Sequence, residues 1–363
     1  NSLTFTVVGR APRDGVERFS LPLLMPTVII ACTDSKRVPD AGGVLPAPIQ
    51  KSSPRTIERA VDILARGGLV ALPTETVYGL AADAGNARAV ARIFEAKERP
   101  QFNPLICHVA GRAMADRLVV IDDEADRLIE TFWPGPLTLV LPRKEDAPIA
   151  DLVTAGQDTV AVRYPAHSVA RQILFALDRP IAAPSANPSG RLSPTRADHV
   201  QESLGEKVEL IVDGGPCAVG LESTIVLVVA DALVVLRHGS ISTADLRAAS
   251  SRPVRERDDG DPINAPGQLL SHYAPRAGLR LEADDAADDE ILIGFGVHAG
   301  DMNLSPAGDL EEAAANLFQM LREADRRADK IAVAPIPFEG LGRAINDRLR
   351  RAAAPRPNKS GAA

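Results

Sequence analysis

The sequence predicts an α/β protein with a mixed sheet, followed by a second and smaller α/β domain. Strand-like and helix-like segments alternate throughout residues 53–248, which is the pattern of a sheet connected by helices. Two apolar strands, 223–229 and 233–237, then follow one another without a helix between them, which indicates that the sheet is mixed. A further strand–helix–strand–helix unit occupies residues 290–352, after a segment rich in Ser, Pro, Arg, Asp and Gly.

The helices of the first region are placed by their end signals. Ser53 is a cap residue followed by a proline at the first helical position, and Gly67-Gly68 ends the segment. Asn86 caps a helix that runs to residue 97. The other helices are expected at residues 123–132, 168–177 and 195–204, and the strands at 69–72, 105–109, 137–141, 159–163, 181–183 and 210–212.

The length of 363 residues indicates two domains, because a single ordinary core is smaller. The first Met is Met25, and Pro22 and Pro26 interrupt the apolar run around it, so residues 1–50 are expected to be loosely packed or disordered. Residues 1–24 are expected to be an artefact of a wrongly placed start or of a fragment. The expected order is an N-terminal extension (1–50), a main domain (51–248), a linker (249–275), a small domain (276–353) and a frayed tail (354–363).

Composition argues against several classes of protein. The chain is 45% hydrophobic and 25% charged, as globular proteins are, and it has no run of eighteen apolar residues for a membrane span. A net charge of −7 gives no overall attraction to nucleic acid or anionic lipid. Cys32, Cys107 and Cys217 are widely spaced, which argues against a disulfide framework or a zinc cluster and favours the cytoplasm.

The most informative stretch is Pro-Thr-Glu-Thr-Val-Tyr-Gly-Leu, residues 73–80, directly after the buried strand 69–72. Pro73 has no N–H and therefore ends the strand. Polar side chains just past a buried strand are where α/β proteins usually place ligand sites. A strand-to-helix turn with a Thr cap explains the same residues, so this stretch alone does not decide.

Other predicted strand and helix ends carry cations and hydroxyls. Lys97 and Arg99 either complement a helix dipole or grip phosphate oxygens. His108 taken alone is typical of a structural strand residue, whereas Arg163 requires a carboxylate partner from the protein or from a ligand. Ser185, Asn187 and Ser189 follow a strand, and Ser193-Pro194-Thr195 is predicted to cap a helix whose N–H groups bind anions.

The usual nucleotide and hydrolase motifs are absent. There is no G-x-x-x-x-G-K-[ST], no H-E-x-x-H and no G-x-S-x-G, and the third glycine that Gly294-Phe-Gly296 needs is misplaced. Instead, one ordered set of motifs occurs: P-T-E-T-V-Y-G-L, K-E-R-P-x-x-N-P-L, W-P-G-P-L-T, D-T-V-A-V-R, A-A-P-S-A-N-P-S-G, S-P-T, D-G-G and G-x-E-S-T-I.

On these motifs the chain closely resembles the YrdC family, the L-threonylcarbamoyladenylate synthases, over residues 53–248. The family signature Lys-x-Arg plus Ser-x-Asn is met by Lys97, Arg99, Ser185 and Asn187. Later motifs resemble the linker and small C-terminal domain of the two-domain Sua-type members: Ala265-Pro-Gly267, His272-Tyr-Ala-Pro275 and Gly340-Leu-Gly-Arg-Ala-Ile-Asn346. The linker departs from the usual pattern at Gln268-Leu-Leu270.

The resemblance implies an open, twisted mixed sheet with a deep cationic cavity and a small Rossmann-like C-terminal domain. It implies that L-threonine, bicarbonate and ATP give threonylcarbamoyl-AMP and pyrophosphate, for threonylcarbamoyladenosine modification of tRNA. Mg²⁺ is expected mainly on the ATP phosphates, with no protein metal ligand. Tyr273 is the expected lid.

The resemblance also implies residue roles. The catalytic set would be Lys97, Arg99, Ser185 and Asn187. Threonine would be held by Thr76, His108, Arg163 and Ser223. ATP would be held by Arg99, Asn103, Thr159, Ala183, Ser185, Ser193, Arg237 and Tyr273. Glu75 and Tyr78 receive no role.

Two other functions remain open at this point. One is a module of the same fold that binds double-stranded RNA or tRNA without synthase activity, and the other is a related carbamoyl- or acyl-phosphate transfer enzyme. The intact Lys97, Arg99, Ser185 and Asn187 set favours the synthase. Its expected partners are the downstream transferase proteins of tRNA modification, with a weak direct contact to RNA and none to membranes.

Overall fold

The computed structural model describes residues 48–258 and 271–355. The predictions for residues 1–47, for Ala265-Pro-Gly267 and Gln268-Leu-Leu270 in the linker, and for the end of the tail lie outside the described residues. Residues 44–363 belong to one compact unit of the chain.

Eleven strands within the described residues form one mixed sheet, which confirms the predicted fold class. Parallel and antiparallel neighbours alternate irregularly along it: β2 is antiparallel to β3, whereas β4 is parallel to β6. In spatial order the strands are β1 (Ile49–Lys51), β8 (Leu210–Asp213), β2 (Val70–Leu72), β3 (Gly79–Asp83), β7 (Ile181–Ala182), β4 (Ile106–His108), β6 (Thr159–Arg163), β5 (Leu137–Pro142), β9 (Thr224–Val229), β10 (Ala232–Arg237) and β11 (Val254–Glu256).

The helices connect these strands and begin where local signals predict. Ser53 accepts a hydrogen bond from the Thr56 N–H at 3.1 Å, and Asn86 accepts from the Arg88 N–H at 3.1 Å. The helices of this region are α1 (Pro54–Ala65), α2 (Ala87–Lys97), α3 (Arg112–Ala115), α4 (Asp123–Phe132), α5 (Asp151–Thr154), α6 (Ser168–Leu177), α7 (Ala197–Leu204) and α8 (Thr243–Ala249), with a 3₁₀ turn at Gly205–Lys207.

Both faces of the sheet are covered, as the alternation along β2 demonstrates. Ala71 belongs to a core that also contains Ile93 of α2 and Leu128 of α4. Val70 and Leu72 belong to a second core with residues of α1 and α6. Because successive strand residues point to opposite faces, the sheet is the middle layer between two sets of helices.

The stretch after β2 turns back into a strand and does not lead into a helix. Thr74 closes the turn, since its hydroxyl donates to the Val77 carbonyl at 2.6 Å and accepts from the N–H of Val77 at 3.2 Å. The chain then returns as β3, antiparallel to β2. Gly79 and Leu80 therefore pair with β2, which the sequence did not predict.

The predicted cap at Ser193-Pro194-Thr195 is wrong. Helix α7 begins at Ala197, its N-cap is Arg196, and no side chain caps it. The Thr195 N–H bonds to Nδ1 of His199 at 3.3 Å, and the Ser193 hydroxyl bonds to a carboxylate far along the chain. The Thr195 N–H and the Ser193 hydroxyl therefore bind other side chains in the folded protein, and they do not cap the helix as the local sequence pattern had predicted.

Two short strands also fall where the sequence predicted loose or linker chain. Ile49–Lys51 forms β1, which pairs with β8. Val254–Glu256 forms β11, which pairs in parallel with β10. Each strand has three residues and lies at one end of the sheet, so its periodicity is too short to read from sequence.

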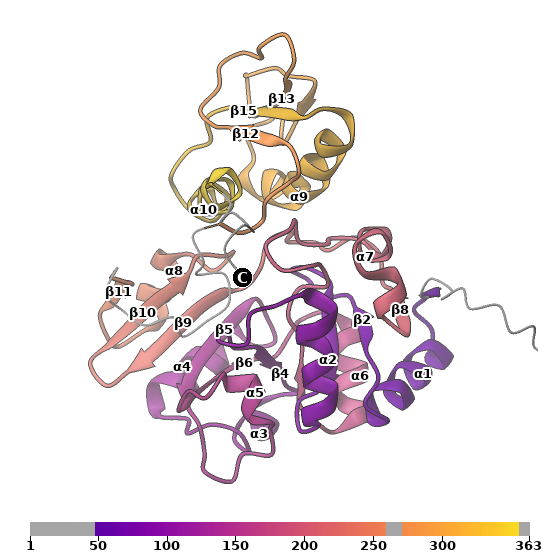
Figure 1. Cartoon of the computed structure of the whole chain (residues 1–363). Helices are drawn as coiled ribbons and strands as arrows, with labels where there is room; N and C mark the ends of the chain where they lie inside the picture. The colour runs from indigo at the N-terminus through magenta and orange to yellow at the C-terminus, as the bar shows by residue number, and fades with distance from the viewer. Residues whose placement is uncertain (1–47, 259–270, 356–363) are drawn as a thin grey trace, which may run out of the picture. The chain divides into compact units, whose positions relative to one another are not determined.

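The C-terminal part contains a second sheet, as Figure 1 shows in orange to yellow. Four parallel strands form it in the order β12 (Gly278–Arg280), β15 (Lys330–Val333), β13 (Ile291–Gly294) and β14 (Met302–Asn303). Helices α9 (Leu310–Arg327) and α10 (Gly342–Ala353) accompany it. The all-parallel order matches the predicted Rossmann-like arrangement, although β12 and β14 were not predicted.

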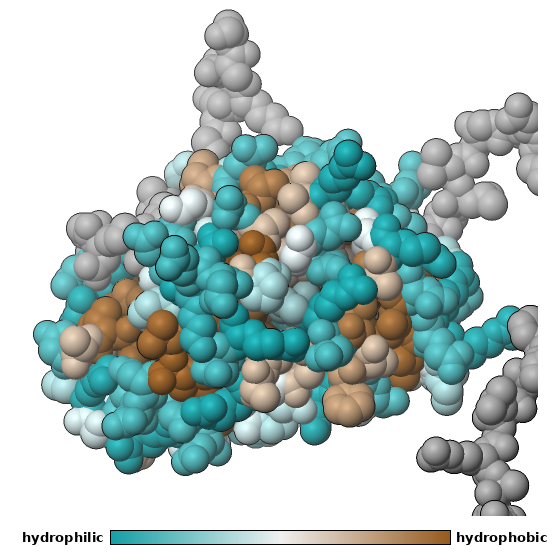
Figure 2. All heavy atoms as spheres, turned by 90° about the horizontal axis from the view of Figure 1, so that it is seen from below, coloured by the Kyte–Doolittle hydropathy of each residue, from teal (hydrophilic) through white to brown (hydrophobic). Residues whose placement is uncertain are grey.

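Among the described residues, no helix combines the length and the apolar composition that crossing a membrane requires. On the face shown in Figure 2, hydrophobic residues form separate patches between hydrophilic ones. Scattered patches of this kind are ordinary on protein surfaces.

Candidate active site

A pocket lies against one face of the large sheet. Ile106 and His108 of β4 line it, whereas Cys107, which points to the other face, is buried in the first helical core. Arg163 of β6 pairs in register with His108 and lines the pocket beside it. The site is therefore built on a sheet face, because β2 and β7 run opposite to β4 and their ends do not share one edge.

The last residue of α2 anchors the loop that follows β7. Lys97 is 1% exposed, and its Nζ donates to the carbonyl oxygens of Ser185 and Asn187, each at 2.5 Å. The N–H of Ser189 donates back to the Lys97 carbonyl at 2.7 Å. Burial lowers the pKa of Lys97 well below its usual value, and the nearby charge of Arg99 lowers it further. The Lys-x-Arg and Ser-x-Asn motifs thus form one interlocked structure.

Within the described residues, Arg99 is held by backbone oxygens and by no carboxylate. Its Nε donates to the Asn103 carbonyl at 3.1 Å, and its Nη2 donates to the Pro104 carbonyl at 2.8 Å. Burial, together with the charge of Arg237, lowers the pKa of Arg99 to about 9. A buried guanidinium bound only to carbonyls and repelled by a second cation is poised for an anionic ligand.

Arg163 has a protein carboxylate as its partner. Its Nη2 donates to Glu75 Oε1 at 2.5 Å, its Nη1 to the Thr76 hydroxyl at 2.9 Å and its Nε to the Gly135 carbonyl at 3.2 Å. Burial alone would raise the pKa of Glu75, but the charge and hydrogen bond of Arg163 bring it below its usual value. Glu75, which had no predicted role, therefore fixes Arg163 beside Thr76.

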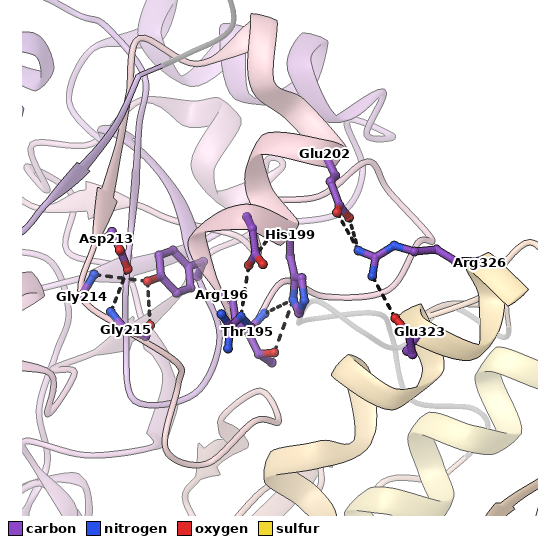
Figure 3. Close-up of polar contacts among 11 residues, drawn as sticks. Thr195, Arg196, His199, Glu202, Asp213, Gly214, Gly215, Glu323 and Arg326 are labelled. Carbon is purple, nitrogen blue, oxygen red and sulfur yellow. Dashed lines mark hydrogen bonds and ion pairs between the residues drawn. The ribbon is translucent and has the colours of Figure 1, made fainter. Parts of the chain in front are cut away.

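The other residue of the octapeptide without a predicted role, Tyr78, supports the backbone. Its hydroxyl donates to the Gly215 carbonyl at 2.7 Å and accepts from the Gly214 N–H at 3.2 Å, a contact drawn in Figure 3. Burial raises the pKa of the Tyr78 hydroxyl, which stays a neutral donor. The D-G-G motif is thereby tied to the turn that carries Thr76.

Hydroxyls and a second arginine line the pocket near β9 and β10. Ser223 Oγ lies 2.7 Å from the Thr138 hydroxyl, and Nη2 of Arg237 donates to Ser223 Oγ at 3.1 Å. His108 stays neutral, because burial first and the charge of Arg163 second lower its pKa to about 3. The pocket thus combines cations with neutral polar groups.

Tyr273 of the linker closes one wall of the pocket. It is 1% exposed and has a positive φ of 61°, a conformation that costs a bulky residue energy and is typical of functional sites. Its ring meets His272 edge-on, with the centroids 4.1 Å apart. The N–H of Ala274 next to it donates to the Gly190 carbonyl at 2.8 Å, which ties this segment to the loop after β7.

The pocket brings together most of the predicted site residues, namely Thr76, Lys97, Arg99, His108, Arg163, Ala183, Ser185, Asn187, Ser223, Arg237 and Tyr273. Three predicted residues do not line it. Asn103 reaches it only through its carbonyl bond to Arg99, and Ser193 reaches it through Glu222. Thr159 begins β6, at the opposite end of that strand from Arg163.

Sequence reasoning missed Glu222 and His272, which also line the pocket. Both lie in motifs that the sequence singled out, G-L-E-S-T and H-Y-A-P. Glu222 is 6% exposed and accepts a hydrogen bond from the Ser193 hydroxyl. The available signal was a carboxylate and a histidine directly beside the predicted site residues Ser223 and Tyr273.

Several buried polar atoms of the pocket have no hydrogen-bond partner among the described residues. They are His108 Nδ1, Asn187 Oδ1, His272 Nδ1 and Tyr273 Oη. Native proteins leave few such atoms, so a group of them around one pocket indicates a polar ligand. The cations Lys97, Arg99, Arg163 and Arg237 line the same pocket, which favours an anionic one.

Comparison with protein families covers both parts of the chain. Residues 62–239 match the family of Sua5, YciO and YrdC proteins, described as telomere recombination. Residues 241–354 match the family described as threonylcarbamoyl-AMP synthase, C-terminal domain. The boundary between the two matches falls just after β10.

Individual relatives cover most of the described chain. A threonylcarbamoyl-AMP synthase of Pyrococcus abyssi is 41% identical, over 82% of this chain and 93% of the relative. One from Bacillus subtilis is 38% identical, over 82% and 92%. The crystal structure of P. abyssi Sua5 complexed with L-threonine superposes with a TM-score of 0.77 at 38% identity, covering 84% of this chain and 96% of that one. The chain belongs to the threonylcarbamoyl-AMP synthase family, in its two-domain form.

Proposed function

We propose that this protein is a threonylcarbamoyl-AMP synthase, which makes threonylcarbamoyl-AMP and pyrophosphate from L-threonine, bicarbonate and ATP. The observation that carries the proposal is the buried pocket in which four cations meet several hydroxyls and neutral polar groups. Such a lining suits the phosphates of a nucleotide at one end and a small polar amino acid at the other.

Threonine would lie at the end of the pocket formed by Thr76, His108, Arg163 and Ser223. Arg163 keeps Glu75 as its partner, so its guanidinium is already oriented when the threonine carboxylate arrives. Neutral His108 and the Ser223 hydroxyl would bond to the threonine without adding charge. The relative from P. abyssi crystallised with L-threonine supports an amino-acid site in this fold.

ATP would occupy the more strongly cationic end. Arg99, Arg237 and Lys97 line it, and Ser185 and Asn187 lie on the loop that Lys97 holds. The negative charges of the α-, β- and γ-phosphates would balance the positive charges of Lys97 and Arg99. Asn103, Thr159, Ala183, Ser193 and Tyr273 remain proposed ATP contacts, of which Ala183 and Tyr273 line the pocket.

The chemistry needs no nucleophile from the enzyme. Bicarbonate takes up a proton and loses water to give CO₂. The threonine amine adds to this CO₂ and loses a proton, which gives a carbamate. A carbamate oxygen then attacks the α-phosphorus of ATP, and the bond to the β-phosphate breaks with release of pyrophosphate. The contribution of the protein would be positioning and neutralisation of the phosphate charge.

We propose that Mg²⁺ enters with ATP and is held mainly by its phosphates. The described residues contain no cluster of three or more His, Cys, Asp and Glu side chains that would make a protein cage. The two carboxylates near the pocket, Glu75 and Glu222, are each bonded to an arginine. The surroundings therefore fit a metal that keeps its waters and phosphate ligands. Tyr273 would act as the lid that excludes water from the carbamate.

The product would feed threonylcarbamoyladenosine modification of tRNA through downstream transferase proteins, and we propose that any direct contact with tRNA or double-stranded RNA is weak. The cytoplasm is the expected compartment, since Cys107 and Cys217 are buried free thiols. A pure RNA-binding module is less favoured, because it would not require a buried pocket of this composition.

The deciding experiment measures pyrophosphate release from MgATP with bicarbonate, in the presence and absence of L-threonine. We expect release that depends on both threonine and bicarbonate, with threonylcarbamoyl-AMP detected by mass spectrometry. L-Serine, which lacks one methyl group, is the matched control substrate. Threonine-independent release, or no release from a folded protein that binds ATP, would contradict the proposed function.

A further inference from the structure

Helix α10 of the C-terminal domain carries a fully buried arginine that belongs to the pocket's charge network. The side chain of Arg348 has 0% exposure, and its Nε donates to Glu222 Oε2 at 3.0 Å. Glu222 lines the pocket of the large sheet. An ion pair that joins residues 126 positions apart therefore connects the two parts of the protein.

The same guanidinium contacts the linker. Its central carbon lies 5.2 Å from the ring centroid of Tyr273, which is cation–π distance. A second carboxylate, Asp347, accepts from Arg348 Nη1 at 2.9 Å and from Arg351 Nε at 2.8 Å. Arg348 is thus fixed on three sides by Glu222, Tyr273 and Asp347.

Glu222 is the reason why this position matters for an anionic ligand. Burial would raise the pKa of Glu222, but Arg348, Arg237 and the hydrogen bond from Ser193 lower it, so the carboxylate stays charged. A charged carboxylate in the wall of a phosphate pocket repels the phosphates. Among the neighbouring cations, Arg348 does most to lower the pKa of Glu222.

The backbone around Glu222 is also adapted to the C-terminal domain. Gly220 has φ +76°, and a Cβ on it would lie 2.5 Å from the carbonyl oxygen of Ala314 in α9. Only glycine allows the helix to approach the loop this closely. The two domains therefore meet at the G-L-E-S-T motif through both a backbone contact and a buried ion pair.

We propose that the C-terminal domain completes the ATP pocket through Arg348, a positioning residue that neutralises and orients Glu222 beside the phosphates. The inference rests on the proposed function, since it assigns a task within the same pocket. It gives the second domain an electrostatic role in nucleotide binding.

The test measures the Kd of MgATP by calorimetry in the full-length protein, together with the threonine KM. Arg348→Met keeps the volume and removes the charge, so Glu222 is left unopposed. We expect MgATP binding to weaken at least about tenfold, while the threonine KM changes much less. The double variant Arg348→Met with Glu222→Gln removes both charges, and we expect its Kd to return to within about threefold of the original.

The matched control is Arg326→Met. Arg326 of α9 pairs with Glu202 of α7 at 2.6 Å, and both side chains are 47% exposed, so this second ion pair between the same two domains is solvated (Figure 3). We expect its loss to leave the MgATP Kd unchanged. Circular dichroism and thermal melts establish that each variant is folded.

An unchanged MgATP Kd in folded Arg348→Met, or a double variant that binds as weakly as the single one, overturns the proposal. If Arg348→Met does not fold, Gly220→Ala replaces it: this change keeps every pocket side chain but forces α9 away, and undiminished MgATP binding then overturns the proposal. Wild-type protein that binds MgATP but never forms the adenylate refutes the proposed function instead, and the binding test of Arg348 still stands.

Discussion

The two sheets of this protein differ in the hydrogen bonding of polar residues near their strand ends, as Ser305 and His108 illustrate. In the C-terminal sheet, Ser305 after β14 donates to Glu312 at 2.5 Å and accepts from the Asp309 N–H at 3.0 Å. In the large sheet, His108 at the end of β4 has a buried Nδ1 without a partner among the described residues. Ser305 therefore has both of its partners within the C-terminal part, whereas His108 keeps one polar atom for a ligand.

The two regions also differ in how their charged side chains are paired. Among the described residues, the pocket of the large sheet is lined by four cations and by one carboxylate, Glu222. Arg280 at the end of β12, by contrast, has its own carboxylate partner, Glu290, at 2.6 Å. Both sheets are α/β and both bear polar residues near strand ends, so polar residues alone do not identify a site. Unbalanced buried charge and missing hydrogen-bond partners do.

The largest expected effect breaks the buried pair of the large sheet. Arg163→Met leaves Glu75 buried without its cation, and we expect a loss of about 3–5 kcal/mol in the free energy of unfolding, measured with urea. The threonine KM should rise as well. The double variant with Glu75→Gln should regain most of the stability. A single variant as stable as the original protein would show that the pair contributes nothing.

Arg99→Met should have the next largest effect, on activity and not on stability. The guanidinium is repelled by Arg237, and its partners in the described part of the chain are two carbonyls, so its removal costs the fold little. The phosphates, however, lose a donor. We expect kcat/KM to fall at least about 100-fold. Arg88→Met, on the exposed start of α2, is the control and should retain full activity. Turnover that survives Arg99→Met would remove Arg99 from the site.

Ser305→Ala tests the C-terminal sheet, where we expect polar residues to contribute to stability and not to catalysis. It removes the acceptor of the Asp309 N–H, and we expect about 1–3 kcal/mol less stability with unchanged kcat/KM. Thermal melts and the pyrophosphate assay measure the two quantities. A fall in activity without a fall in stability would mean that the C-terminal strand ends also serve the chemistry.

The smallest expected effect is a pH dependence. Burial and Arg163 lower the pKa of His108 from 6.5 to about 3, so below pH 6.5 the unfolded chain takes up a proton that the native protein refuses. Stability contributed by neutral His108 is therefore present above pH 6.5 and is lost as the pH falls toward 3.

We expect His108→Gln to reduce the pH dependence of unfolding between pH 6 and 4 by about 1 kcal/mol per pH unit. Urea unfolding at several pH values measures the slope. His199 also has a lowered pKa, near 4, so some dependence should remain in the variant. An unaltered slope would mean that His108 is protonated in the native protein.

Much of the fold could be predicted from local signals. Helices α4 and α6 begin and end at the predicted residues, because a cap or an apolar period of about 3.6 lies within each segment. Strand β6 also matches the prediction. Strands β3 and β14 were missed, since their residues become strands only by pairing with distant segments.

The candidate site was likewise predictable only in part: its motifs could be found from the sequence, but the contacts between them could not. The motifs containing Lys97 and Arg99, and Ser185 and Asn187, were found from sequence, and they line one pocket. The pattern gave no means to see that Lys97 would bind the carbonyls of Ser185 and Asn187. Thr159 begins the strand whose other end carries the pocket arginine, and its contact with ATP stays a prediction.

The sequence by itself determined the order of the elements, the caps of the main helices and the residue types that can hold an anion. These depend on neighbours within a few positions, whose effects are local and readable. The tertiary structure decided the charge pairing: Glu75 with Arg163 across 88 residues, and Glu222 with Arg348 across 126. Buried charges are stable only beside a partner, and only the folded chain brings such partners together.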